Sequence, residues 1–311
     1  MLIRKFQAFA LIALGALAVP FAMAADQNQQ VGGHAVVTVD PGKETPGNIP
    51  QSALHLKLNG KESEVTGFTP LREPQSKVEL VVLVDDAARG SLGTQMKDIA
   101  NFIQGQMPGT KVGVAYMLNG RAVFSQPLTT DLAAAAHGVH LPMAGEGASS
   151  SPYFCLSDLA KNWPSNDPHA RREVVMISDG VDNYEPRYDP EDPYVQAAMN
   201  DAVRAHLIVY TIYWRSRGRL GGSNYGAYDG QNLLTEVAGA TGGKSYWEGL
   251  GNPVSFDPYF KDIDQRIDNQ FELDFMTVGS SKPAIDSLKL TVSARAKLDA
   301  PGEVYVHPGA E

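Results

Sequence analysis

The stretch KVELVVLVDD, residues 77–86, decides the fold of this chain. Leucine and valine residues follow one another along it without leaving a polar face, and two aspartates end the run. A strand that is apolar on both sides suits the centre of a parallel sheet covered by helices on both faces. The run therefore predicts an α/β domain whose first strand ends in carboxylates.

The sequence after this strand alternates between helical and strand patterns. Residues 91–107 carry apolar side chains at helical spacing, and further helices are expected near 153–163, 193–205, 230–240 and 257–270. Strands are expected at 111–118, 121–128, 172–180, 206–214 and 271–278. Such alternation predicts a three-layer α/β sandwich, with helices on both faces of a mostly parallel sheet.

Two asparagine–glycine pairs predict tight hairpins. Asn59-Gly60 and Asn119-Gly120 stand between strand patterns, and both residue types tolerate a positive φ. The strand at 121–128 is therefore expected to run antiparallel to its neighbour. Ligands of open α/β sheets bind at the carboxyl ends of the strands. We expect the loops at 85–92, 126–132, 179–192 and 214–230 to form the working face.

The ends of the chain differ from this pattern. Residues 1–24 have a short basic start, an apolar run at 6–19 and the small-residue site Ala22-Met23-Ala24, which predicts a signal peptide; a membrane anchor is the alternative. Residues 25–52 are polar and rich in glycine, proline and glutamine, and are expected to be a flexible lead-in. The predicted α/β domain spans 77–278. The flanks 53–76 and 279–311 are expected to form an additional strand layer beside it.

Composition restricts the function. The formal net charge is −9, and cleavage of the signal peptide would make the chain more acidic, which argues against binding to nucleic acid or an anionic membrane. No other segment approaches the length of a membrane span. Cys155 is the only cysteine, so no internal disulfide can form, and its apolar surroundings predict a buried thiol. We expect a protein of the periplasm or the cell exterior.

Four pieces in order resemble the von Willebrand factor A-like family, in particular its secreted bacterial members. They are VVLVDDAARGSLG at 81–93, QPLTTDLAAA at 126–135, VVMISDGVDN at 174–183, and the stretch from AGATGGKSYWEG to IDNQFELDF at 238–275. The resemblance implies a Rossmann-like sandwich that binds a partner. It also implies a metal-ion-dependent adhesion site, in which Asp-x-Ser-x-Ser, a threonine and a later aspartate hold a Mg²⁺-like ion through oxygen ligands.

This chain departs from the family's metal pattern. Asp85 matches the first aspartate, Thr129 or Thr130 the threonine, and Asp179 the last aspartate. Alanine at position 87 and arginine at position 89 replace the two serines, and Ser91 does not match a motif position. We therefore expect a degenerate site at Asp85, Thr130 and Asp179, with weak or no Mg²⁺ binding and no other cofactor. A purely structural role for the aspartates, accepting backbone N–H bonds, is the alternative.

The segment WRSRGRLGGSNYGAYDG, residues 214–230, follows a strand and is expected to lie over the same face. Arginine and tyrosine are favoured anchors at protein interfaces. One hypothesis is that Arg89, Arg215, Arg217 and Arg219, with Tyr225, bind an acidic group on a protein partner directly. A solvated loop is the alternative.

Catalytic motifs are absent from the sequence. There is no GxSxG, and DDAARGSLG lacks the GxGxxG of dinucleotide sites. AGATGGKS follows a helix and precedes a strand, the reverse of a phosphate-binding loop, and predicts a glycine C-cap. We therefore predict a secreted or periplasmic protein-binding module and no enzyme. The alternatives are an adhesin with a working Mg²⁺ site, a structural envelope component and an undetected hydrolase.

Overall fold

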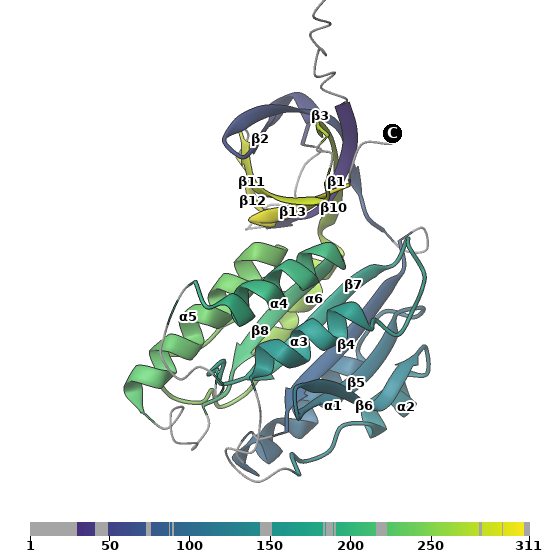
Figure 1. Cartoon of the computed structure of the whole chain (residues 1–311). Coiled ribbons are helices and arrows are strands. Elements are labelled where there is room, and N and C mark those ends of the chain that lie inside the picture. Colours follow the sequence, from purple (N-terminus) through teal and green to yellow (C-terminus); the bar gives the residue numbers. More distant parts are fainter. Residues whose placement is uncertain are drawn as a thin grey trace, which may run out of the picture.

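The computed structural model describes residues 30–40, 49–72, 76–86, 88, 90–143, 151–182, 184, 189, 191–215, 223–279, 282–293 and 295–307. These residues form two parts, each with its own sheet (Figure 1). The predicted signal peptide lies outside the described residues. No helix in the described ranges is long and apolar enough to cross a membrane.

The α/β part contains a six-stranded sheet in the order β6-β5-β4-β7-β8-β9. Strand β4 pairs in parallel with β5 and β7, β7 with β8, and β8 with β9, whereas β6 is antiparallel to β5. Every residue of β4 is buried, as expected for a central strand. The strands are β4 (Val78–Asp85), β5 (Lys111–Leu118), β6 (Arg121–Thr129), β7 (Arg171–Ser178), β8 (Leu207–Tyr213) and β9 (Ser245–Tyr246).

Helices cover both faces of this sheet. One apolar core lies between the sheet and the helices α1 (Met96–Gln104), α2 (Leu132–His137) and α6 (Asp257–Asp268). A second core lies on the other face, under α3 (Pro152–Lys161), α4 (Pro193–Arg204) and α5 (Asn224–Thr241). The three-layer prediction therefore describes this part of the chain. The short 3₁₀ helix η2 (Gly90–Gln95) follows β4, and η1 (Gln51–Ala53) precedes β2.

The second part is a seven-stranded sheet, in the order β12-β1-β10-β3-β2-β11-β13, that curls around a third apolar core (Figure 1). We call this part the β barrel. The predicted contact between the two flanks is confirmed, because β2 pairs with β11. Its strands are β1 (Gln30–Asp40), β2 (Leu54–Leu58), β3 (Lys61–Pro70), β10 (Gln270–Val278), β11 (Ala284–Val292), β12 (Lys297–Asp299) and β13 (Glu303–Val306).

Two predicted boundaries are wrong. Residues 30–40, expected within a flexible lead-in, form β1, which pairs with β10 along nine registered positions from Gln30 to Thr38. Residues 271–278, assigned to the α/β domain, belong to β10 and to the barrel sheet. The α/β part is thus an insertion between β3 and β10, which are neighbours in the barrel sheet. Both connections leave the barrel from adjacent strands.

The side chain of Gln270, at the start of β10, links the β barrel to the α/β part. Its side-chain amide donates to Glu173 Oε1 at 2.9 Å, and its amide oxygen accepts from Arg171 Nη1 at 2.6 Å. Both partners lie on β7, and all three residues are buried. Burial raises the pKa of Glu173 to about 7, against the opposing effects of Arg171 and the Gln270 amide.

The turns predicted at the two asparagine–glycine pairs and at the glycines of AGATGGKS are confirmed. Asn59 and Gly60 have φ values of 48° and 77°, and Asn119 and Gly120 have 50° and 75°. Both pairs are therefore hairpins with two positive φ angles. Gly242 ends α5 with a φ of 83°, which confirms a helix C-cap in AGATGGKS.

Candidate functional site

Four aspartates gather where β4 and β7 end. Asp85 and Asp86 follow β4, whereas Asp179 and Asp182 follow β7, and each is at most 6% exposed. The two strands are adjacent and in register, so their carboxyl ends meet at one edge of the sheet. We call this set the aspartate cluster. Two of its members, Asp85 and Asp179, were expected here from the sequence.

Hydrogen bonds within the chain hold the carboxylates of this cluster. Asp85 Oδ2 accepts from the Ser178 hydroxyl at 3.0 Å, and Asp179 Oδ1 accepts from the backbone N–H of Val181 at 3.0 Å. The Ser178 hydroxyl also accepts from the Gly180 N–H at 3.1 Å. Carboxylates that accept such bonds order the loops that follow the strands.

The chain leading into α3 also crosses this edge. The N–H of Met143 donates to Asp86 Oδ1 at 2.7 Å, and the Tyr153 hydroxyl donates to the carbonyl of Gly180 at 2.7 Å. Ser151 caps the helix from a fully buried position by accepting from the Tyr153 N–H. Sequence reasoning missed these three residues as part of the edge. The Ser151-Pro152 pair was a usable signal, because it is typical of a helix start.

The structure corrects the assignment of Thr129 and Thr130. Strand β6 runs antiparallel, so its end lies at the amino edge of the parallel strands: Thr129 pairs with Val112, whereas Asp85 pairs with Met117 on the same strand β5. This register offset corresponds to about 16 Å along the strand. The threonines and the loop at 126–132 are therefore at the opposite edge from the aspartate cluster, and the expected convergence is wrong.

The negative charge of the cluster acts on its buried neighbours. The pKa of Tyr153 is raised well above its ordinary value, first by burial and then by Asp182 and Asp179. Burial, followed by the charge of Asp85, raises the pKa of Cys155 to about 12. The thiol is buried, as the sequence predicts. A nucleophilic cysteine needs a lowered pKa and access to solvent, so Cys155 is unsuited to that chemistry.

The described residues do not form a ready-made metal centre. Within them, no group of three or more His, Cys, Asp or Glu side chains could hold a metal ion. One carboxylate oxygen of Asp85 already accepts a hydrogen bond from Ser178 Oγ, and one of Asp179 accepts from the N–H of Val181. The arginine at position 89 and the alanine at position 87 lie outside the described residues, and Ser91 is exposed on η2.

Arg215 is the described member of the predicted arginine group, and its guanidinium is used within the chain. Nη1 donates to the carbonyl of Leu250 at 2.9 Å, and Nη2 donates to Asn224 Oδ1 at 3.2 Å. It thereby connects the loop before α6 to the start of α5. Positions 217 and 219 lie outside the described residues. Tyr225, on the first turn of α5, is 66% exposed.

Comparison with known proteins gives distant structural similarity. No family model matches the chain, and no curated protein matches its sequence. An aerotolerance-related membrane protein from Bacteroides fragilis aligns at 18% identity over 61% of this chain and 98% of its own, with a TM-score of 0.45. A von Willebrand factor type A protein from Catenulispora acidiphila aligns at 12% identity, over 90% and 74%, with a TM-score of 0.44.

A third solved structure is the von Willebrand domain of the type V pilus tip protein Mfa5 from Porphyromonas gingivalis. It aligns at 12% identity over 65% of this chain and 96% of its own, with a TM-score of 0.43. The α/β part has a mixed six-stranded sheet with one antiparallel edge strand, helices on both faces and aspartates at the ends of β4 and β7. In these features it resembles a von Willebrand factor A-like domain. In this domain the aspartate cluster lies at the carboxyl edge, and the barrel lies beyond the amino edge (Figure 1).

Proposed function

We propose that this chain is an exported protein-binding module that docks a protein partner on the carboxyl edge of its von Willebrand A-like domain. Large apolar or aromatic side chains that stay exposed around this edge carry the proposal. Most of them belong to segments that follow the carboxyl ends of the parallel strands, whereas Leu141 and Met143 belong to the chain that crosses this edge before α3. The set, which we call the edge ring, comprises Leu141, Met143, Tyr184, Tyr194, Tyr225, Tyr228 and Val254.

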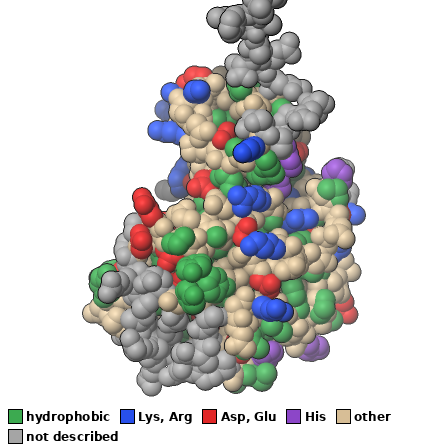
Figure 2. Space-filling view, in the orientation of Figure 1, with side chains coloured by type: hydrophobic (Ala, Val, Ile, Leu, Met, Phe, Trp, Pro, Cys, Tyr) green, Lys and Arg blue, Asp and Glu red, His purple; other side chains and the backbone are tan. Residues whose placement is uncertain are grey.

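Exposed apolar groups that gather on one face mark interaction sites more often than scattered ones do. Met143 is 80% exposed and Val254 is 95% exposed. The backbone of each still makes a hydrogen bond, since Met143 N donates to Asp86 and the Val254 carbonyl accepts from Gln95. Figure 2 shows hydrophobic side chains in the half of the molecule that is distant from the barrel.

Three aromatic rings within this region pack against one another. Tyr184 and Tyr194 lie edge to face with ring centroids 5.0 Å apart, and both contact Phe154 at 5.4 and 5.2 Å. Such contacts hold the rings in place before a partner arrives. Preorganised aromatic side chains lower the entropy cost of binding, and they are common anchors at interfaces.

We keep part of the hypothesis that arginines bind an acidic group of the partner. Arg215 connects two segments of the domain, so we propose it as a positioning residue. We propose Arg89, Arg217 and Arg219 as contacts to an acidic group of the partner, because in the sequence they stand directly after β4 and β8. Tyr225 contributes an exposed ring beside them in sequence.

We propose that the family's metal site is degenerate here and binds Mg²⁺ weakly or not at all. Hydroxyl ligands are replaced by Ala87 and Arg89 in the sequence, and a permanent guanidinium repels a divalent ion. The Ser178 hydroxyl and the Val181 N–H supply hydrogen bonds to Asp85 and Asp179. Partner capture is therefore expected to be independent of divalent cations.

The proposal places the protein in the periplasm or outside the cell and gives it no catalytic step. The signal peptide that the sequence predicts at residues 1–24 supports the location, and the buried Cys155, whose pKa is raised, supports the absence of thiol chemistry.

Affinity capture from native envelope extract tests the proposal. The mature chain is immobilised and compared with the variant Tyr225→Ala/Tyr228→Ala and with Met107→Ser, an exposed apolar residue on the turn after α1. We expect the same specific partner with wild type and Met107→Ser, with and without EDTA, and loss of it with the tyrosine variant. Capture that EDTA abolishes would instead support the metal-dependent adhesin. Equal capture by all three proteins would contradict the edge ring.

A further inference from the structure

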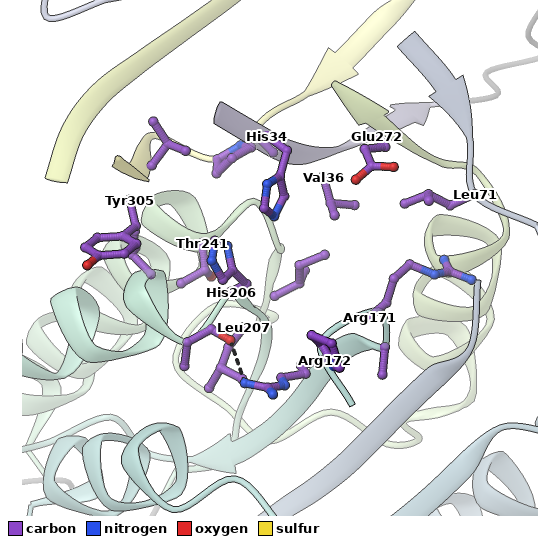
Figure 3. A pocket seen from close by; sticks show the side chains of 18 of the residues that line it. His34, Val36, Leu71, Arg171, Arg172, His206, Leu207, Thr241, Glu272 and Tyr305 are labelled. Atoms are coloured by element: carbon purple, nitrogen blue, oxygen red, sulfur yellow. Dashed lines mark hydrogen bonds between the residues drawn. The ribbon is translucent and has the colours of Figure 1, made fainter. Parts of the chain in front are cut away.

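Hollows between the barrel and the α/β part differ in the charge of their walls. One of about 620 Å³ lies beyond the amino edge of the parallel strands, where His34 of the barrel stacks on His206 with ring centroids 4.9 Å apart (Figure 3). Its walls carry both signs of charge, among them Arg171, Arg172 and Glu272. Another, of about 540 Å³, lies beside the edge strand β9, and its walls are mainly positive. We call it the lysine hollow.

Elements from both parts of the chain line the lysine hollow. The end of α5, β9 and one residue of α6 line it from the α/β part, and β11 and β12 line it from the barrel. Small-molecule sites typically enclose about 300–1,000 Å³, so the volume is sufficient for a ligand. The charged lining residues are Lys244, Lys289, Lys297, Arg266 and Asp299. Four cations against one carboxylate make a locally positive wall in a chain whose net charge is −9.

The carboxylate of this wall is already neutralised. Arg266, which is buried, donates from Nη2 to Asp299 Oδ2 at 2.8 Å. Lys297 has no such close partner among the described residues: its Nζ lies 3.6 Å from Asp299 and 3.6 Å from Asp40, beyond hydrogen-bond distance. Its side chain is 70% exposed. The ammonium group of Lys297 is therefore accessible to a ligand.

The other two lysines also have donors to offer. Lys289 forms no ion pair with any described residue, and the residue directly opposite it on β2 is Lys57, which pairs with Glu62 at 3.0 Å. Like charges opposite each other destabilise a sheet, and a bound anion would relieve this repulsion. Lys244 donates to Asp262 at 2.7 Å, but an ammonium group has three donors and this side chain is exposed.

An indole ring and a glycine complete the hollow. Trp247 lines it and is 48% exposed, whereas the other two tryptophans of the chain, Trp163 and Trp214, are buried. Gly239 lies within α5, where glycine costs stability relative to alanine. A Cβ at this position would meet no heavy atom within 4 Å, so no packing contact in the described structure requires a glycine. The space above it is open to a ligand that approaches the helix closely.

The end of α5 does not present free acceptors to the hollow. Carbonyl groups at a helix C-terminus carry partial negative charge, which disfavours an anion. Here the carbonyl of Ala238 accepts from the N–H of Gly243 at 2.9 Å, and the carbonyl of Gly239 accepts from the N–H of Gly302 at 2.8 Å. Because these oxygens are paired within the chain, the lysines determine the charge that the hollow attracts.

We propose that the lysine hollow binds an acidic sugar, a carbohydrate that carries a carboxylate or a phosphate. The anionic group lies among the ammonium groups of Lys289, Lys297 and Lys244, and the C–H face of the sugar ring packs on Trp247. A sugar uses both features of the wall, its charge and its flat ring, whereas an acidic peptide would use the charge alone. The site is separate from the edge ring, and its ligand is different from the protein partner proposed there.

Titration calorimetry on the mature chain at pH 7.5 and low salt tests this inference with defined probes. Trigalacturonate carries carboxylates and glucose 6-phosphate carries a phosphate, maltotriose is a neutral sugar, and triglutamate is an acidic peptide. We expect saturable one-to-one binding of at least one acidic sugar, with a dissociation constant below about 1 mM. Maltotriose and triglutamate are each expected to bind at least about tenfold more weakly than that sugar.

Variants locate the binding. The double variant Lys289→Gln/Lys297→Gln removes two charges and is expected to weaken the acidic sugar about tenfold or more, as is Trp247→Ala. Lys97→Gln removes an exposed lysine on α1 and is expected to bind like wild type. The Tyr225→Ala/Tyr228→Ala variant is also expected to bind the sugar normally, which separates this site from the proposed partner surface.

Filling the hollow is a further test that distinguishes binding from folding. Gly239→Leu places a side chain in the open space and replaces glycine with a better helix former. Its Tm is therefore expected to equal or exceed that of wild type, while its affinity for the acidic sugar falls about tenfold or more. Circular dichroism measures the Tm of this and of every other variant.

Three results would overturn the inference. The first is no saturable binding of either acidic sugar up to about 10 mM, a range that includes weak sites. The second is binding of maltotriose or triglutamate that equals or exceeds that of the acidic sugars, because the hollow would then select the ring or the charge alone. The third is binding of the sugar that the double lysine variant and Gly239→Leu both leave unchanged, because the ligand would then lie elsewhere.

Discussion

The Ser178 hydroxyl donates to the Asp85 carboxylate across the ends of β7 and β4, with 3.0 Å between Oγ and Oδ2. The same hydroxyl accepts from the N–H of Gly180, where the chain turns with a φ of 68°. Both side chains are buried. One serine thus connects Asp85 to the loop that carries Asp179, the two aspartates of the expected metal pattern.

Replacing this serine tests its structural role. Ser178→Ala removes the donor to Asp85 and the acceptor for Gly180 within a buried site, so we expect a loss of about 1–3 kcal/mol in the free energy of unfolding. Urea denaturation measures this loss. The matched control is Thr130→Ala, an exposed hydroxyl at the opposite edge, which is expected to change stability by less than about 0.5 kcal/mol. A larger effect at Thr130 would contradict the placement of the two residues.

The hydrogen bonds at position 215 need the two separate nitrogens of a guanidinium group. Arg215 donates through separate nitrogens to Leu250 and Asn224, which a lysine cannot do. Arg215→Lys is therefore expected to lower the free energy of unfolding by about 1–2 kcal/mol, with Arg215→Ala lower still. Denaturation curves measure stability, and hydrogen exchange at residues 248–256 measures the loosening of the loop. If both variants keep wild-type stability but lose the partner, Arg215 contacts the partner directly.

The pKa of Glu173 predicts a pH effect with a definite sign. In the folded state the pKa of this carboxyl is about 7, above its ordinary value of 4.5. The folded protein therefore holds the proton more tightly than the unfolded chain does. Its contribution to stability is thus complete below pH 4.5 and is lost as the pH rises through 7. Glu173→Gln cannot ionise, so its stability relative to wild type should improve on going from pH 5 to pH 8.

The size of this improvement is on the order of 1–3 kcal/mol, and urea denaturation at the two pH values measures it. Comparing variant with wild type at each pH removes the contributions of other groups, among them His206, whose lowered pKa acts in the opposite direction between pH 4 and 6.5. A difference that stays constant with pH would show that Glu173 is ionised in the folded protein.

Calorimetry with Mg²⁺ and Mn²⁺ tests the degenerate metal site. We expect no binding with a dissociation constant below about 1 mM, because the hydroxyl ligands of the pattern are missing and the carboxylates already accept hydrogen bonds. Tight one-to-one binding that Asp85→Ala abolishes would contradict this expectation.

Local features of the fold could be predicted from the sequence. The apolar run ending at Asp85 identified the central strand, and the two asparagine–glycine pairs identified hairpins, because neighbouring residues determine both. These local patterns do not show to which sheet a strand belongs. Phe271–Val278 alternates like any strand, but its hydrogen-bond partners on β1 and β3 are remote in sequence.

The candidate site was predictable only where it follows a parallel strand. Asp85 and Asp179 were placed correctly at strand ends, whereas Thr130 was misplaced because its strand is antiparallel and ends at the other edge. The hairpin at Asn119-Gly120 already carried that information. The edge ring depends on which side chains remain exposed after packing, and no local pattern encodes this property.

Docking of a protein partner on the carboxyl edge can be measured directly once that partner is in hand. Surface plasmon resonance compares the captured partner's affinity for wild type, for Tyr225→Ala/Tyr228→Ala and for Met107→Ser. We expect the tyrosine substitutions to raise the dissociation constant at least about 30-fold, roughly 2 kcal/mol, and Met107→Ser to leave it unchanged. Equal affinity for wild type and the tyrosine variant, with both folded, would contradict it.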